Sequence, residues 1–180
     1  MSAFRLQCAA SPSYPGDALT EWYAQASMTL PPMILEAVYP LFDALPLDHA
    51  MSELLVRRPA DEPALKLAWG IVDHPAISAR PELVAGVWLY VDELDASHKV
   101  SQGMSSQTGS FWHAIVHRRE GDYDNALYWY RRVGHHPAFS KIPGFEPEML
   151  VEAAKSRETG AVSMQRKEWA ALFEWCALSV

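Results

Sequence analysis

Apolar residues along this chain recur at three- and four-residue spacing, which is the period of an amphipathic helix. No convincing run alternates apolar with polar residues, and no Asn-Gly pair marks a hairpin between two strands. The pattern therefore predicts an all-α fold. The expected helices cover nine ranges: 17–29, 32–45, 47–58, 62–73, 81–99, 108–120, 122–134, 147–158 and 161–177.

Proline and glycine mark most of the gaps between these ranges. Pro63 and Pro81 each stand near the start of a predicted helix, where the missing backbone N–H has no helical partner to lose. Residues 134–147 are rich in both residue types and are expected to be irregular. No stretch has the composition of a flexible linker. We therefore expect residues 1–180 to form one compact domain of antiparallel helical hairpins.

The overall charge limits the classes of partner. Fifteen Lys and Arg residues against 22 Asp and Glu residues give a net charge of −7, which argues against general binding to nucleic acid or to anionic membranes. No run approaches the roughly 20 apolar residues of a membrane span, and the N-terminus lacks the pattern of a signal peptide. The two cysteines, Cys8 and Cys176, are too few for a disulfide framework. These features predict a soluble cytoplasmic protein.

Histidines gather in one part of the chain. His113, His117 and Glu120 are spaced at i, i+4 and i+7, which places them within a stripe roughly 60° wide on one helical face. His98 lies near the end of the preceding predicted helix. If ranges 81–99 and 108–120 form an antiparallel hairpin, His98 lies opposite Gly109 and within about one helical turn of His113. His98, His113 and His117 can then converge.

Three chemical interpretations of this cluster remain open. Three imidazoles beside a carboxylate suffice for a zinc or iron(II) site with an open coordination position. Without a metal, His113 or His117 would act as general acid or base, with Glu120 orienting the ring. The third interpretation is a structural cluster whose polar groups satisfy one another. The chain has no glycine-rich phosphate loop or dinucleotide fingerprint, so no nucleotide cofactor is expected.

A small basic region follows the same histidines. Residues 111–137 carry four arginines against three acidic residues in an otherwise acidic chain, which suits a single carboxylate or phosphate. The polar connection before residue 110 adds the free backbone N–H groups of a helix start. We therefore expect a small anionic ligand, bound by Gln102, Thr108, Ser110, Arg118, Arg131 and Arg132.

A simpler interpretation of the same residues also stands. Thr108 or Ser110 would then only cap the helix. The arginines would in that case pair with acidic residues of the preceding helix, at positions 92, 93 and 95.

Residues 110–137 resemble one helix-turn-helix unit of a tetratricopeptide or Sel1-like repeat. The resemblance rests on Ala114, Gly121, Asp122, Tyr123, Ala126, Tyr130 and Val133. Gly121 would end one helix, Asp122 would cap the next, and the two alanines would let the helices approach closely. The longer string "WHAIVHRREGDYDNALYWYRRVGHHP", with "EWAALFEWC" near the C-terminus, also resembles a family of uncharacterised bacterial proteins.

Two functions follow as hypotheses. The first is a small-molecule enzyme or ligand-binding protein with a His/Glu/Arg pocket between helices 81–99 and 108–134. The second is implied by the repeat resemblance: a non-catalytic module that binds a protein partner in a groove formed by Tyr128, Trp129 and Tyr130.

Overall fold

The computed structural model describes residues 28–179, and within that range all regular secondary structure is helical, as predicted. The prediction for residues 17–29 falls almost wholly outside this range. The elements are α2 (Pro32–Ala44), α3 (Glu62–Val72), α4 (Pro75–Ser78), α5 (Pro81–Tyr90), α6 (Leu94–Gln102), α7 (Gln107–Glu120), α8 (Tyr123–Val133), the 3-10 helix η1 (Pro137–Lys141), α9 (Pro147–Ser156) and α10 (Ala161–Leu178).

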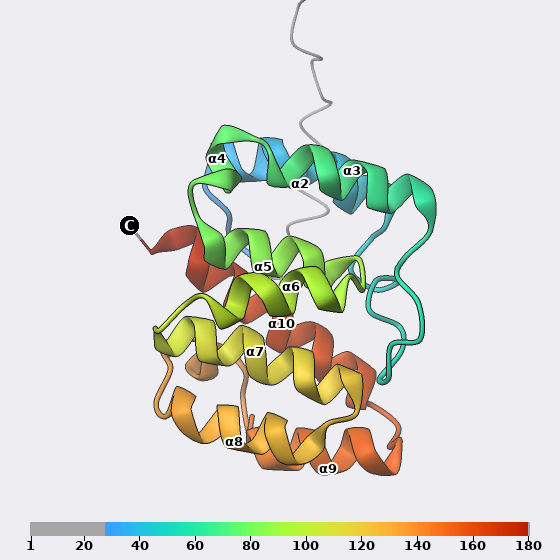
Figure 1. The fold of residues 1–180 in the computed structure, drawn as a ribbon, viewed down its shortest axis with the longest axis vertical. Helices are drawn as coiled ribbons and strands as arrows, with labels where there is room; N and C mark the ends of the chain where they lie inside the picture. Colours follow the sequence, from blue (N-terminus) through green and yellow to red (C-terminus); the bar gives the residue numbers. More distant parts are fainter. Residues whose placement is uncertain (1–27, 180) are drawn as a thin grey trace, which may run out of the picture.

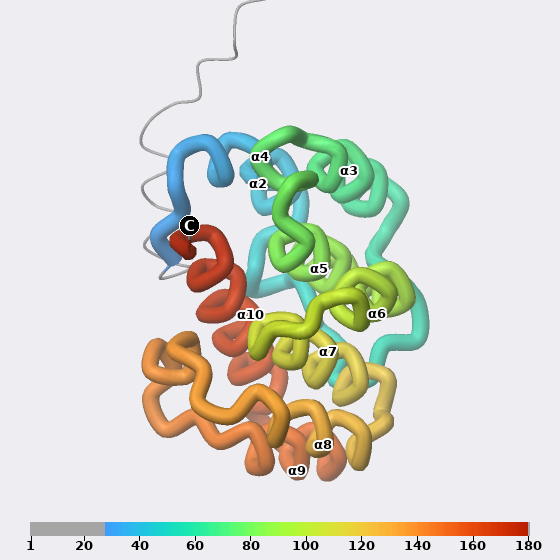
Figure 2. The backbone as a smooth tube through the Cα atoms, turned by 60° about the vertical axis from the view of Figure 1, so that its left-hand side comes forward, coloured from blue at the N-terminus to red at the C-terminus, as the bar shows by residue number. Residues whose placement is uncertain are grey.

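Most helices pack against their neighbours in sequence (Figure 1). From α5 to α9, each helix lies beside the next, and α2, α3 and α4 form a layer at one end of the molecule. Helix α10 returns across this succession and packs against α5, α9 and η1, as the turned view in Figure 2 shows. None of the helices within residues 28–179 is long and apolar enough to cross a membrane.

An aromatic cluster joins α2, α5 and α10 in the core. The Trp169 ring stacks on Phe173 at 4.7 Å and lies 4.8 Å from Tyr90. Phe42 from α2 packs on Tyr90 at 5.0 Å. Gly86 allows this close approach, because a Cβ atom there would lie 2.7 Å from the Phe173 ring. Ring burial of this kind supplies much of the stability of a small helical domain.

Helix α7 is surrounded by protein on all sides. Residues 109–119 are all buried, against α5, α6 and α8 and against side chains of α10. This part of α7 exposes too little surface to receive its charged residues. Each polar side chain of α7 therefore needs a partner inside the protein.

The predicted hairpin of α7 and α8 is present. Gly121 ends α7 in the left-handed conformation with φ of 89°, which glycine adopts without steric cost. The Asp122 carboxylate then caps α8 by accepting a hydrogen bond from the backbone N–H of Asn125 at 3.3 Å. Ala114 and Ala126 are fully buried in this hairpin.

The expectation of one helix over 81–99 is wrong. The chain breaks at 91–93 into α5 and α6. Asp92 takes a left-handed conformation with φ of 61°, and its carboxylate pairs with the buried Arg119 guanidinium at 2.7 Å. No proline or glycine marks this break. It coincides instead with the contact between Asp92 and Arg119, which are distant in sequence.

The expected helix over 47–58 is also wrong, since this segment forms turns, bends and irregular chain. Its backbone carbonyls accept hydrogen bonds from side chains of other helices. Gln165 donates to the carbonyl of Met51 at 2.8 Å, and Arg119 donates to that of Glu53 at 3.0 Å. These tertiary hydrogen bonds replace the helical ladder that the local sequence favours. The other predicted helices that begin within residues 28–179 agree with the structure to within two residues at each end: 32–45, 62–73, 108–120, 122–134, 147–158 and 161–177.

Candidate metal centre

Three histidines from two adjacent helices converge. The ring of His98 on α6 lies 4.4 Å from that of His113 and 5.1 Å from that of His117, both on α7. His113 and His117 are one turn apart, with their ring centres separated by 4.7 Å. One ring nitrogen of each residue lies within 4.8 Å of the others. Imidazoles at this spacing can bind one metal ion after small side-chain rotations.

The register of the hairpin differs slightly from the expected one. His98 lies beside His113 and His117, and the residue in close contact with Gly109 is Met104 of the connection, 2.4 Å from the position of a Cβ atom on that glycine. Helix α6 continues to Gln102, so the connection to α7 is shorter than predicted. His98 consequently sits between His113 and His117.

Contacts to Nδ1 determine which ring nitrogen of His113 and of His117 carries the free lone pair. Nδ1 of His117 lies 3.0 Å from the Glu120 carboxylate and 3.9 Å from that of Asp122. Nδ1 of His113 lies 3.4 Å from the Ser101 hydroxyl, which itself donates to the backbone carbonyl of His98 at 3.1 Å. The Ser101 oxygen therefore accepts a hydrogen bond from His113. In both rings Nε2 is then the nitrogen with an available lone pair, as in metal sites where a carboxylate or hydroxyl orients the ligand.

Burial favours the neutral form of two of these imidazoles, those of His113 and His117. Burial, with the neighbouring rings of His98 and His117, lowers the pKa of His113 to about 4. Burial also lowers the pKa of His117, although the Glu120 carboxylate opposes the shift. Because a metal binds the neutral form of imidazole, these rings need not lose a proton on binding at pH 7.

Two residues of α8 complete the surroundings. The Trp129 ring lies 4.2 Å from that of His113 and covers that side of the cluster. The Asn125 amide nitrogen is 3.2 Å from Nε2 and 3.4 Å from Nδ1 of His117, so it lies alongside the ring and is not aligned with one lone pair. An apolar wall and a small polar group thus border the three nitrogens.

Arg118 does not belong to this site, contrary to expectation. Its side chain is fully buried on another side of α7, where it forms an ion pair with Glu168 of α10 and donates to Gln165 at 3.0 Å. Burial lowers the pKa of Arg118, but Glu168 and the Tyr130 hydroxyl together outweigh this effect, so the net shift is upward. Arg118 is therefore a charged core residue.

Tyr130 is equally unavailable to the expected partner groove. Its hydroxyl donates to the Glu168 carboxylate at 2.5 Å inside the same network, and its side chain is buried. Of the three aromatic residues expected in the groove, Tyr128 is exposed and Trp129 is half-buried against His113.

The remaining predicted ligand-binding residues lie apart from one another. Ser106, not Thr108 or Ser110, caps α7 by accepting from the N–H of Gly109 at 3.1 Å. The Thr108 hydroxyl contacts Nε2 of His136 at 3.1 Å, and Ser110 is buried and donates to the carbonyl of Ser106. Gln102 ends α6 in an exposed position.

The two exposed arginines of α8 differ from each other. Arg132 lies over the rings of Trp129 and Tyr128, beside the cluster. Arg131 is exposed next to it and makes no such contact.

Ser101 and Asn125 are site residues that the sequence reasoning missed. Ser101 follows His98 by three residues and so shares its helical face, which is a signal that could have revealed it. Asn125 reaches the cluster only because α8 folds back on α7 in this register.

Comparison of the chain with protein-family models, with curated proteins and with solved structures finds no match. The resemblance of residues 110–137 to a tetratricopeptide or Sel1-like repeat therefore stays a prediction. The geometry of the cluster itself is the basis for a functional assignment.

Proposed function

We propose that this protein binds one divalent transition metal ion through His98, His113 and His117 and uses it to act on a small anionic molecule. The observation that carries the proposal is the convergence of three imidazoles, with ligand atoms within 4.8 Å. Hydrogen bonds that orient His113 and His117 support it further.

The ligand set favours zinc over iron(II). Iron(II) sites of the facial type use two histidines and a carboxylate as direct ligands. Here the Glu120 carboxylate is held by Nδ1 of His117, so it supports a ligand and is not one itself. Three neutral histidines with one open position are typical of catalytic zinc, which lowers the pKa of a bound water to about 7. We therefore assign the site to metal-assisted hydrolysis of a small substrate.

Metal analysis tests the proposal directly. Protein purified without an affinity tag is expected to hold about one equivalent of zinc, or to take up one equivalent of zinc or cobalt(II) after dialysis. Variants His113→Leu and His117→Leu should lose this binding. His135→Leu is the matched control, because His135 is exposed and lies outside the cluster. Uptake below about a tenth of an equivalent by the wild-type protein would overturn the proposal.

Stability of the metal-free variants gives a second measurement. Groups held for binding need not be optimal for stability, so we expect His113→Leu and His117→Leu to be nearly neutral or stabilising in urea unfolding. A loss above about 3 kcal/mol in both variants, with metal still bound, would show that the cluster is structural.

A further inference from the structure

Arg132 is held beside the histidine cluster by two aromatic rings. Its guanidinium carbon lies 5.3 Å from the centre of the Trp129 ring and 5.9 Å from that of Tyr128. These rings precede it by three and four residues and so lie one turn back on α8. Cation–π attraction therefore restricts an arginine whose side chain is otherwise exposed.

Trp129 connects this arginine to the candidate metal ligands. The same indole that lies under Arg132 packs on the ring of His113 at 4.2 Å. The Trp129 ring is thus a shared neighbour of the candidate ligand His113 and of the Arg132 guanidinium.

The charge of Arg132 is free to bind a ligand. No carboxylate within residues 28–179 forms an ion pair with it. In contrast, Arg118 and Arg119 are buried and paired with Glu168 and Asp92. A guanidinium stacked on rings keeps its N–H edge available, and that edge binds a carboxylate or phosphate through two parallel hydrogen bonds.

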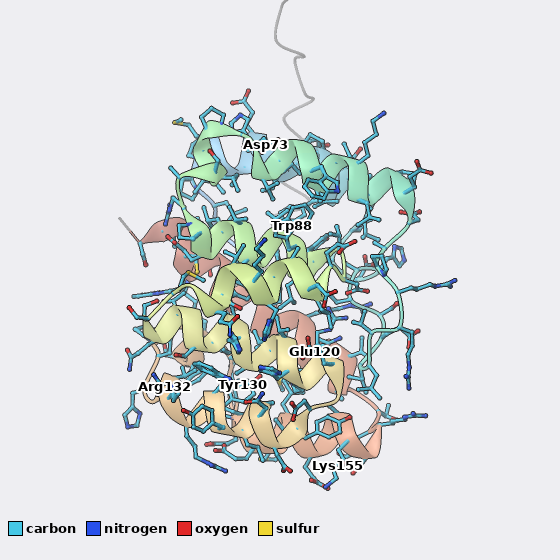
Figure 3. The ribbon with its side chains drawn as sticks, viewed as in Figure 1. Asp73, Trp88, Glu120, Tyr130, Arg132 and Lys155 are labelled. Carbon is cyan, nitrogen blue, oxygen red and sulfur yellow. The ribbon has the colours of Figure 1, made fainter. Side chains whose placement is uncertain are left out.

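The two ends of the cluster carry opposite charge. Glu120 and Asp122 lie beside His117, at 3.0 and 3.9 Å from its Nδ1. Figure 3 shows Glu120 and Arg132 toward opposite ends of the hairpin formed by α7 and α8. An anionic group is therefore repelled from the Glu120 end and attracted to the Arg132 end. This polarity gives a bound ligand one preferred direction.

We infer that the ligand is a two-headed anion: one head binds the metal, and a carboxylate or phosphate at the other end binds Arg132. The inference rests on the proposed metal site and adds the class of molecule that the site selects. An aliphatic spacer between the heads passes along the Trp129 ring.

A series of carboxylates on the cobalt(II)-loaded full chain tests the inference. Acetate, succinate, glutarate and adipate are titrated while the visible cobalt spectrum is recorded. We expect at least one diacid to bind about tenfold more tightly than acetate, since one charge-assisted contact contributes about that factor. Arg132→Gln should remove this advantage and leave acetate binding unchanged. Arg131→Gln, at the neighbouring exposed position, should retain it.

Two results would overturn the inference while leaving the metal site intact. One is a wild-type protein that binds every diacid no better than acetate. The other is an Arg132→Gln variant that keeps the full diacid advantage. The cobalt spectrum before any addition reports the metal site separately, so its absence would overturn the proposed function, and the inference with it.

Discussion

The Glu120 carboxylate accepts a hydrogen bond from Nδ1 of His117 across 3.0 Å, one turn along α7. This contact orients the imidazole and makes its Nε2 more basic. It also joins an exposed residue at the end of the helix to a histidine that is 7 % exposed. A substitution of Glu120 can therefore perturb the candidate centre without disturbing the core.

Substitution of Glu120 should weaken metal binding and leave the fold intact. Loss of an orienting carboxylate typically lowers metal affinity by about 10- to 100-fold, which we expect for Glu120→Ala in competition with a chromogenic chelator. Glu120→Gln should lose less, because its amide oxygen still accepts the hydrogen bond. Asp124→Ala, an exposed position at the start of α8, serves as the control. Equal affinities for the wild type and Glu120→Ala would contradict this role.

His136 should make stability depend on pH. Burial lowers its pKa to about 4 from an ordinary value of 6.5. Between these pH values the unfolded chain binds a proton that the folded chain does not, so stability falls as the pH falls through this window. We expect His136 alone to contribute up to about 3 kcal/mol of this loss.

Two neighbouring variants isolate that contribution. Urea unfolding of the metal-free protein at pH 7 and pH 4.5 should show a smaller acid-induced loss for His136→Asn than for the wild type. His135→Asn, which changes an exposed ring, should behave as the wild type does. Identical losses in all three proteins would rule out His136 as the source.

Replacing one member of the buried pair of Arg118 and Glu168 should lower the free energy of unfolding strongly. Replacing both members should lower it by less than the sum of the two single changes. Arg118→Met leaves a buried carboxylate without its cation, which we expect to cost about 3–5 kcal/mol in urea unfolding. The double variant Arg118→Met, Glu168→Leu should lose clearly less than the sum of the two single variants.

A surface pair provides the comparison for this measurement. Lys155 and Glu152 are exposed and 3.9 Å apart, so Lys155→Met should cost less than about 1 kcal/mol. Additive losses for Arg118 and Glu168 would show that the two residues do not stabilise each other.

Most of the helical fold could be predicted from sequence because its signals are local. Apolar spacing and proline at the first or second helical position define α2, α3, α5 and α9. The failures at 47–58 and 91–93 have non-local causes. Arg119 pairs with Asp92 at one of these places and donates to the Glu53 carbonyl at the other. Arg119 lies outside both segments, so no pattern within either segment predicts these contacts.

The convergence of the three histidines could be predicted from sequence, but the burial of Arg118 could not. His113 and His117 share a face by simple helical period, and an antiparallel hairpin brings His98 to them. Arg118 looks like a surface cation in the sequence. It is buried because α7 has protein on every side and Glu168 supplies a counter-charge from α10. Only the packing of distant helices determines that outcome.

The three histidines come from one short part of the chain, and this bears on how the chain folds. His98 and His117 are separated only by residues 99–116, which form the end of α6, a short connection and most of α7. Closing so short a loop has a small entropic cost compared with the pairing of segments far apart in the chain. A metal ion would therefore cross-link this hairpin before α10 has packed across it. In that order of events an ion bound at the proposed site would nucleate folding as well as belong to the finished centre.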